Sequence, residues 1–386
     1  MERIETVMVG AGQAGLSAGY HLAQRGLPFI ILNAERRVGD QWRDRWHSLR
    51  LYSPSRSDGL PGWPFPAAAY HYPLGREMGD YLEAYADRFQ LPVRSGVEAT
   101  RLEQASDGDA FVVTTTDGSR IRAGQVIVAT GPFRKPFTPA FAKDLDPTIH
   151  QIHSHAYRDP SMLRDGPVLV VGLAHSGGDI AYEVARTHRT ILSGKAAGQV
   201  PFRVIETPRD RLLWPVIAFV FGHVLTIRTP MGRRIRAQIL GGQGGAPLIR
   251  VRLPDLDAAG IERHDARTVG VQDGKPMLAD GEVLDVANII WCTGYSRDYD
   301  WIDFPVTGQR GWPDEVRGVS PTVPGLYFLG IPFTYAFTSM LVAGAGRDAG
   351  YVVDRIWDRV RQAAGASAPS TSVEGGGGGP STGLSL

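Results

Sequence analysis

Near its start the chain reads Val7-Met8-Val9-Gly10-Ala11-Gly12-Gln13-Ala14-Gly15. The apolar residues before the glycines are typical of a buried strand, and residues 16–25 have the pattern of a helix. In such a strand–turn–helix unit Gly10 allows the tight turn, Gly12 lets the backbone approach a pyrophosphate, and Gly15 lets the helix pack on the strand. Free N–H groups at the helix start favour the negative charge. The stretch predicts a dinucleotide-binding turn in an α/β fold.

A second copy of the pattern, Gly172-Leu173-Ala174-His175-Ser176-Gly177, follows the apolar run 168–171 and precedes a helix and another strand. Ala174 replaces the middle glycine and adds a methyl group where backbone and phosphate approach each other. We expect this turn to bind a second dinucleotide. The alternative is a duplicated half that no longer binds a nucleotide. Two dinucleotides in one chain indicate electron transfer between them.

The residues that follow the second strand of each unit predict which dinucleotide each turn binds. A carboxylate there selects a free ribose 2′-hydroxyl, and a cation selects a 2′-phosphate. Asn33, with Glu35 close in sequence, suits the hydroxyl in the first unit. Lys195, with Ser193 and Arg203 nearby, suits a 2′-phosphate in the second. We therefore expect FAD in the first unit and NADPH in the second, with a solvated surface lysine as the other interpretation of Lys195.

Two more buried strands, at 126–129 and 287–292, end in Ala129-Thr130-Gly131 and in Cys292-Thr293-Gly294. Ligands in open α/β sheets bind outside the carboxyl ends of the strands, and a glycine there lets the backbone touch a cofactor. We expect both turns to line the cofactor site. Each turn taken alone is also typical of an ordinary loop.

Composition narrows the class of protein. The chain has 386 residues, of which 43% are hydrophobic and 21% charged, enough for two cores. A formal net charge of +1 gives no reason to expect nucleic acid or an anionic membrane as a partner. The single cysteine, Cys292, excludes an internal disulfide and a disulfide-reductase mechanism within this chain. The chain begins with a predicted strand and no basic leader or apolar signal segment, so we expect a cytoplasmic protein.

The apolar run 212–227 is shorter than the roughly 20 residues that a membrane-spanning helix needs, and it contains Pro215 and Gly222. We favour a helical excursion that roofs a substrate cavity. Plain core packing and a membrane-surface anchor are the alternatives, because Arg228, Arg233, Arg234 and Arg236 follow the run. Residues 363–386 offer too few apolar groups to offset the cost of ordering, so we expect a disordered tail.

The chain resembles the class B flavoprotein monooxygenases, specifically the bacterial branch near the flavin-containing monooxygenases. The likeness extends from about residue 4 to residue 361. Besides the two glycine turns, it rests on the stretch 39–46 continuing to Pro54, on Ala129-Thr130-Gly131, on His153-Ser154 with Tyr157, and on Thr293-Gly294-Tyr295. The combination is specific to the group but not to a substrate.

The resemblance implies two Rossmann-like dinucleotide-binding domains, with the NAD(P)H domain inserted into the FAD domain. The FAD domain is expected at 1–164 and 290–362. The NADPH domain is expected at 165–289, with the apolar excursion at 210–245.

The resemblance also implies the reaction. NADPH reduces FAD, oxygen forms a flavin C4a-hydroperoxide, and one oxygen atom passes to a small molecule by N- or S-oxygenation or by Baeyer–Villiger insertion. The partners are then a small-molecule substrate and O2, with no stable membrane insertion and a homodimer as an option. The alternatives are a flavin-dependent NADPH reductase that passes electrons to a quinone or protein acceptor, and a cofactor-binding protein without turnover.

We expect Trp42, Ser53 and His175 to serve catalysis, with simple packing as the other interpretation of Trp42. His153 fits a linker better than a metal or catalytic site, and no metal is expected. Ser339 suits the N-cap of a helix that begins near Thr338 and points at the flavin. The expected cofactor contacts are Gly10, Gly12, Gln13, Ala14, Gly15, Asn33, Glu35, Gly39, Gln41, Trp42, Ser48, Leu49, Val97, Ala129, Thr130, Gly131, Gly172, Ala174, His175, Ser176, Gly177, Ser193, Lys195, Cys292, Thr293, Gly294 and Ser339.

Two departures from the family pattern affect these expectations. Pro147 and Ile149 stand where the family has phenylalanine and glycine before the central histidine, which leaves the subgroup open. His175 stands where an asparagine is usual. It either alters how the nicotinamide is held or is a harmless surface substitution.

Overall fold

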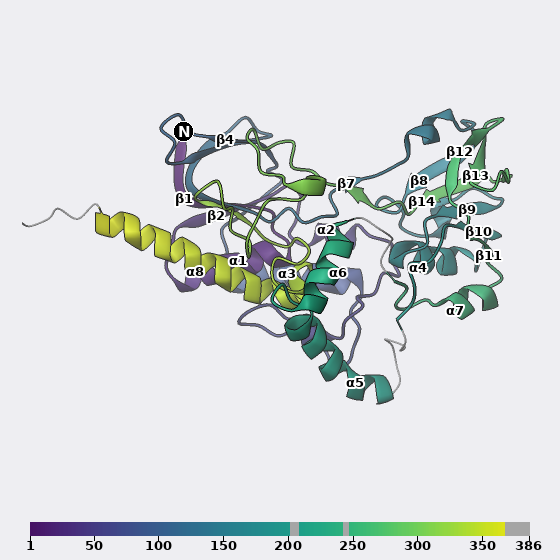
Figure 1. Ribbon diagram of the computed structural model, residues 1–386, viewed down its shortest axis with the longest axis horizontal. Coiled ribbons are helices and arrows are strands. Elements are labelled where there is room, and N and C mark those ends of the chain that lie inside the picture. Colours follow the sequence, from purple (N-terminus) through teal and green to yellow (C-terminus); the bar gives the residue numbers. More distant parts are fainter. Residues whose placement is uncertain (201–207, 242–246, 367–386) are drawn as a thin grey trace, which may run out of the picture.

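A computed structural model describes residues 1–200, 208–241 and 247–366, and Figure 1 shows two lobes joined by thin crossings. The lobe that contains the N-terminus is built on a seven-stranded sheet in the order β3-β2-β1-β6-β5-β4, with β16 paired to β6. Its strands are β1 (Glu2–Val9), β2 (Phe29–Asn33), β3 (Val93–Ser95), β4 (Ala99–Gln104), β5 (Phe111–Thr115), β6 (Arg120–Val128) and β16 (Leu326–Phe328).

The long strand β6 serves both halves of this sheet. Its first residues pair with β5 in the antiparallel direction, and its last residues pair with β1 and β16 in parallel. One sheet face is covered by α1 (Gln13–Gln24), α3 (Gly75–Arg88) and α8 (Val342–Ala366). The sheet therefore brings the ends of β1 and β6 together at one edge.

The second lobe is a five-stranded parallel sheet in the order β11-β10-β9-β14-β8. Its strands are β8 (His150–His153), β9 (Val168–Val171), β10 (Thr190–Ser193), β11 (Glu262–His264) and β14 (Asn288–Trp291), with helices α4 (His175–Val184) and α7 (Leu253–Ala258). The predicted fold class, two parallel-sheet dinucleotide folds in one chain, is confirmed. The strand pairing differs from the expected domain bounds, because β8 and the end of β14 complete the second sheet.

The remaining strands form two separate antiparallel pairs. One joins β12 (Thr268–Gln272) to β13 (Lys275–Leu278), and the other joins β7 (Lys135–Pro136) to β15 (Tyr295–Ser296). Figure 1 shows β7 at the crossing between the lobes. The β7–β15 ladder ties the outgoing and returning crossings together.

The excursion leaves the second lobe and packs on the first. It consists of α5 (Pro208–Phe219), the π-helical turn η4 (Val220–Val224) and α6 (Pro230–Leu240); residues 242–246 lie outside the described residues. Thr226 forms an isolated bridge with Ala336, and the Phe221 ring lies 4.7 Å from the Phe337 ring. None of the helices in the described part of the chain is long and apolar enough to cross a membrane.

The remaining short elements are α2 (Asp40–Arg43), η1 (Ser55–Ser57), η2 (Ala140–Asp144), η3 (Pro160–Met162), η5 (Gln309–Gly311) and η6 (Phe337–Met340). At the C-terminal end α8 continues to Ala366, so residues 363–366, which we expected to be disordered, are helical. The rest of the expected tail, 367–386, lies outside the described residues.

Candidate active site

The first glycine turn is closed against the neighbouring strand end. Gly10 has φ +112°, and a Cβ on it would lie 2.4 Å from the Ala129 carbonyl oxygen. A Cβ on Gly15 would lie 1.9 Å from the Gly10 carbonyl oxygen. Both positions therefore exclude a side chain. Gly12 is the N-cap of α1 and supplies no side-chain cap, so the first N–H groups of the helix are left for a ligand.

The second turn has the same construction. Gly172 has φ +106° with its Cβ position 2.5 Å from the Cys292 carbonyl oxygen, and a Cβ on Gly177 would lie 1.8 Å from the Gly172 carbonyl oxygen. Ala174, the N-cap of α4, has φ −122°, which a non-glycine residue adopts without strain. No side chain caps this helix start either. Ala129 and Cys292 thus occupy equivalent places in two equivalent units.

The two Thr-Gly turns lie beside the glycine turns, as expected from strand order. Gly131 and Gly294 have φ +68° and +81°, and a Cβ on either would meet no atom within 4 Å. Glycine is therefore favoured at both positions by the left-handed backbone conformation, and not by a lack of space for a side chain. The Thr293 hydroxyl donates to the Phe137 carbonyl. Burial raises the pKa of the Cys292 thiol to about 12, so this thiol stays protonated at neutral pH.

At the first ribose position the side chain of Asn33 is already engaged. Asn33 is buried, and its amide donates to the Glu35 carbonyl oxygen at 3.2 Å and to the Ser95 hydroxyl at 3.3 Å. Val97 donates its backbone N–H to the Asn33 carbonyl oxygen at 2.9 Å. Partial burial raises the pKa of the Glu35 carboxyl, and the Asp44 and Asp40 carboxylates raise it further.

At the second ribose position Lys195 and Ser193 have different surroundings. Lys195 is exposed directly beyond β10, and the adjacent Gly194 has its Cβ position 3.6 Å from the Gly172 Cα, which places Lys195 beside the second glycine turn. Ser193 is 1% exposed, and its hydroxyl lies 2.7 Å from the Thr268 hydroxyl inside the core. Ser193 therefore offers no hydroxyl to a 2′-phosphate, contrary to our expectation. Arg203 lies outside the described residues.

The segment 39–49, which includes α2, carries the other expected flavin contacts. A Cβ on Gly12 would lie 2.7 Å from the Gln41 Nε2, so the Gln41 amide lies over the first turn. Gly39, with φ +89°, packs on the Gly79 backbone. Trp42 is half-buried between the cores of both lobes, whereas Leu49 is buried in the core of the second lobe. Ser48 is half-buried.

The N-terminus of α1 faces the segment that precedes α8. The Gln13 amide donates to the Met340 carbonyl oxygen at 3.4 Å, and a Cβ on Gly330 would lie 3.1 Å from the Ala14 Cβ. The expected Ser339 cap differs in detail. Ser339 accepts the backbone N–H groups of Tyr335 and Ala336, each at 3.0 Å, and so caps η6, whereas α8 begins at Val342.

Ser53 is paired with a buried acid that the sequence did not reveal. Its hydroxyl donates to Asp58 Oδ1 at 2.5 Å. Asp58 is 0% exposed, and its second carboxyl oxygen has no partner. Burial raises the pKa of this carboxyl to about 7, although the Ser53 hydrogen bond lowers it. Ser53 can therefore offer a bound group only an oxygen lone pair.

His175 lies in a polar cluster that joins the two lobes. Its ring contacts the Tyr52 ring at 4.7 Å, and burial lowers the pKa of His175 to about 4, so it is neutral at pH 7. The Tyr52 hydroxyl donates to Asp179 Oδ2 at 3.0 Å, and Arg250 pairs with the same oxygen at 3.0 Å. His175 is thus no exposed surface substitution. Tyr52, Asp179 and Arg250 were missed, although an aspartate one turn after His175 on an apolar helix was a usable signal.

Arg45 makes a second link between the lobes. It hydrogen-bonds the Tyr295 hydroxyl and lies 3.1 Å from His155 Nδ1. His153 lies 3.1 Å from the Gly294 carbonyl oxygen, and burial lowers the pKa of His153 to about 4. These contacts fit the linker interpretation of His153.

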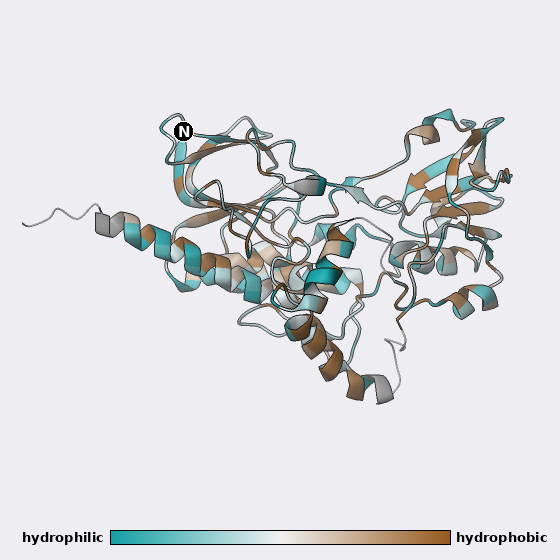
Figure 2. Ribbon diagram, viewed as in Figure 1, coloured by the Kyte–Doolittle hydropathy of each residue, from teal (hydrophilic) through white to brown (hydrophobic). Residues whose placement is uncertain are grey.

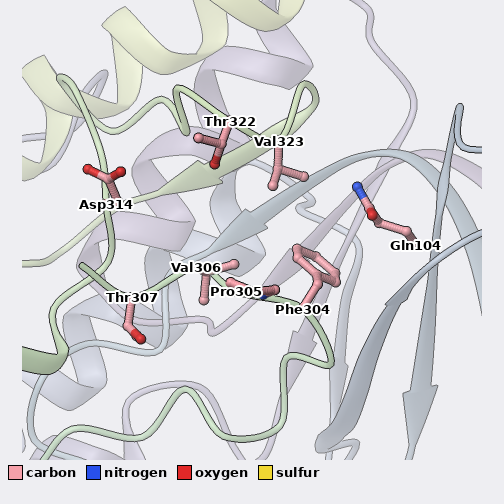
Figure 3. Close-up of a pocket in the computed structure, with 8 residues that line it drawn as sticks. All are labelled: Gln104, Phe304, Pro305, Val306, Thr307, Asp314, Thr322 and Val323. Atoms are coloured by element: carbon pink, nitrogen blue, oxygen red, sulfur yellow. The ribbon is translucent and has the colours of Figure 1, made fainter.

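A hollow elsewhere in the molecule is separate from these residues. It has a volume of about 410 Å³ and is lined by Gln104 at the end of β4 and by residues 304–307, 314, 322 and 323. Figure 3 shows its labelled side chains, with Gln104 on β4 across from those of residues 304–307. None of the expected cofactor contacts lines it.

Comparison with known proteins agrees with this geometry. Residues 7–197 match the family described as pyridine nucleotide-disulphide oxidoreductases. A protein named uncharacterized oxidoreductase CzcO-like, from Geobacillus kaustophilus, is 36% identical over 92% of this chain and 98% of its own length. The uncharacterized oxidoreductase CzcO of Bacillus subtilis is 30% identical over 91% of this chain and 99% of its own.

One of the similar solved structures is an enzyme whose activity is given by its name. The flavin-containing monooxygenase from Stenotrophomonas maltophilia has a TM-score of 0.71 and 26% sequence identity, and the match covers 93% of this chain and 100% of that one. The two proteins therefore share one fold over nearly the whole length of both chains.

Proposed function

Because this chain belongs to the class B flavoprotein monooxygenases, oxidoreductases that use FAD and NADPH, we propose that it oxygenates a small molecule with one atom of O2. The balanced reaction consumes NADPH, a proton, O2 and substrate, and it yields NADP⁺, water and the oxygenated product. The substrate is a soft nitrogen or sulfur nucleophile, or a ketone that undergoes insertion.

One observation supports the proposal above the others. Two glycine turns of the same backbone construction, each locked against the end of a neighbouring strand, occur in the two lobes of one chain. Segment 42–52 belongs to the first lobe, yet Trp46 and Leu49 pack in the core of the second. A protein that holds two dinucleotides and fixes their lobes together is suited to hydride transfer between them.

The residues present fit both cofactors. The uncapped start of α1, with the Gln41 amide over Gly12, would hold the FAD pyrophosphate. The uncapped start of α4 would hold the NADPH pyrophosphate, and Lys195 would meet the 2′-phosphate as an exposed cation. The methyl group of Ala174 costs no backbone strain there.

Bound FAD supplies a hydride acceptor that also activates O2. The finer proposal, oxygen transfer from a flavin C4a-hydroperoxide, rests on the family resemblance. The protein itself orients the two cofactors and excludes water from the space between them. His175 packs on Tyr52 at the start of α4 and is neutral at pH 7. It therefore places no positive charge beside the NADPH turn. The chain has one cysteine, which is half-buried and stays in the thiol form, so no dithiol competes for the electrons.

The excursion is proposed to roof the substrate site from the first lobe. Trp214 on α5 donates its indole N–H to the Ser57 hydroxyl at 2.8 Å, close in sequence to Ser53 and Asp58. Arg211 lies over the Tyr70 ring at 5.7 Å. We also propose a cytoplasmic location and keep a homodimer as an option.

The test uses the yellow holoprotein with NADPH and isotopically labelled O2. The probes are a thioether, a tertiary amine and a cyclic ketone, and product mass reports incorporated oxygen. Rapid mixing of reduced protein with O2 reports the absorbance of an oxygenated flavin. Product that lacks the label, together with fast turnover of an artificial electron acceptor, would replace the proposal with the reductase alternative.

A further inference from the structure

The helix α5 and the start of α6 leave an apolar surface uncovered. Leu212, Val216 and Phe219 follow the spacing of one helix face and are 78%, 60% and 59% exposed, and Met231 is 58% exposed. Figure 2 shows α5 as an apolar helix that projects from the edge of the molecule. We call these four residues the α5 ridge. Core packing therefore does not account for this segment.

The opposite side of the same hairpin is fixed to the body of the protein. Trp214 hydrogen-bonds Ser57, Phe221 contacts the Phe337 ring, and the Gly222 carbonyl accepts from Arg347 at 3.2 Å. The ridge is thus held outward by contacts on its inner side. Its exposure does not result from a detached segment.

The charge around the ridge is predominantly positive. Residues 208–241 contain six arginines and one aspartate, a net charge of +5 in a chain whose total is +1. Arg228, Arg233 and Arg234 are exposed, and none of them pairs with a carboxylate of the described residues. Arg236, beside them on α6, pairs with Glu315 at 3.4 Å.

We propose that the α5 ridge docks on an anionic lipid surface. An exposed apolar ridge bordered by arginines that have no carboxylate partner among the described residues is the arrangement of an interfacial helix, whose apolar side chains enter the headgroup region while cations meet lipid phosphates. A protein partner would require a complementary apolar groove. The docking is peripheral, because α5 has 12 residues and is too short to span a bilayer.

The test is flotation of the full-length FAD-loaded protein with two kinds of vesicle. One is phosphatidylcholine alone, and the other contains about 30% phosphatidylserine. We expect roughly tenfold stronger partition to the anionic vesicles, and a clear loss of partition when salt rises from about 0.1 to about 0.5 M. Equal partition to both vesicles, or none to the anionic vesicles, would overturn the proposal.

Two pairs of variants locate the surface. Val216→Ser with Phe219→Ser removes the centre of the ridge, and Arg233→Gln with Arg234→Gln removes charge. Each pair should lower partition about tenfold, with FAD absorbance and the unfolding temperature unchanged. The matched controls are Val269→Ser with Val316→Ser, which are exposed at 49% and 62%, and Arg76→Gln with Arg186→Gln.

Three results would contradict the assignment. The first is a control pair that lowers partition as much as the ridge pair. The second is a ridge pair without effect. The third is a dimer in light scattering that the ridge pair splits into monomers, since it would assign the ridge to a second copy of the chain. The arginine pair keeps the test decisive if the apolar pair impairs folding.

Discussion

Single residues in this protein acquire their roles from burial. Lys195 and Ser193 are two positions apart, yet one faces water and the other faces Thr268 in the core. Ser53, expected to serve catalysis, directs its hydroxyl hydrogen at Asp58. The residue types were the ones that the chemistry requires, but their availability depends on which face of a strand or loop they occupy.

Lys195→Ala tests the 2′-phosphate assignment. The exposed ammonium beside the second turn should strengthen the binding of NADPH but not of NADH, because NADH has no 2′-phosphate. Loss of a charged hydrogen bond of about 1.5–3 kcal/mol should raise the KM for NADPH roughly 10- to 100-fold and leave the KM for NADH nearly unchanged. Steady-state kinetics with both coenzymes measure this, with Lys143→Ala as the control. Equal effects on both coenzymes would remove the assignment.

Asp58 predicts a pH-dependent stability. Its pKa is about 7 in the folded protein against an ordinary value of 3.8, so the folded state binds the proton more tightly. That stabilisation is complete below about pH 4 and is lost as pH rises to 7, by roughly 4 kcal/mol at most. Asp58→Asn, which stays neutral at both pH values, should therefore raise the unfolding temperature more at pH 8 than at pH 5. The same difference at both pH values would contradict it.

At the scale of the element, the glycines of one turn have unequal tasks. Positions 10 and 15 face backbone carbonyl oxygens, whereas position 12 faces the end of the flexible Gln41 side chain. A side chain at Gly15 displaces backbone, and one at Gly12 displaces only an amide and the ligand. Gly10 and Gly15 are thus needed for the fold, whereas Gly12 is needed to leave room for the cofactor.

Gly12→Val should yield folded but colourless protein, because the new side chain blocks the approach of the pyrophosphate. Gly15→Val should fail to accumulate as folded protein, since its Cβ would lie 1.9 Å from the Gly10 carbonyl oxygen. Absorbance near 450 nm and the unfolding temperature separate the two outcomes. Normal FAD content in Gly12→Val protein would contradict the site.

For the whole molecule, the central question is how two lobes keep one relative position. Tyr52 from the first lobe reaches Asp179 and His175 on α4 of the second, directly after the NADPH turn. The Asp179 carboxyl is buried, and its burial raises its pKa while Arg250 opposes that rise. Removing one donor from such a group costs about 1–3 kcal/mol.

Tyr52→Phe should slow reduction of the flavin by NADPH roughly tenfold without loss of FAD, because the lobes lose a fixed contact beside the coenzyme. Anaerobic stopped-flow absorbance measures the rate. Tyr157→Phe is the matched control, since it removes a tyrosine bond to Glu183 on the same helix, at 3.1 Å, within the second lobe. If both variants slow reduction equally, the link between the lobes has no special part in it.

The sequence by itself determined the two glycine turns, the strand ends beside them and the family, because strand–turn–helix signals are local and each glycine answers a local need. The agreement of α1 with the helix predicted directly after the first glycine turn has the same origin. Only the tertiary structure decided that Ser193 faces inward, that Tyr52, His175, Asp179 and Arg250 form one cluster, and that α5 turns its apolar face outward. Those outcomes depend on contacts between segments up to 157 residues apart, and no local pattern encodes which of several apolar or polar faces a distant segment will cover.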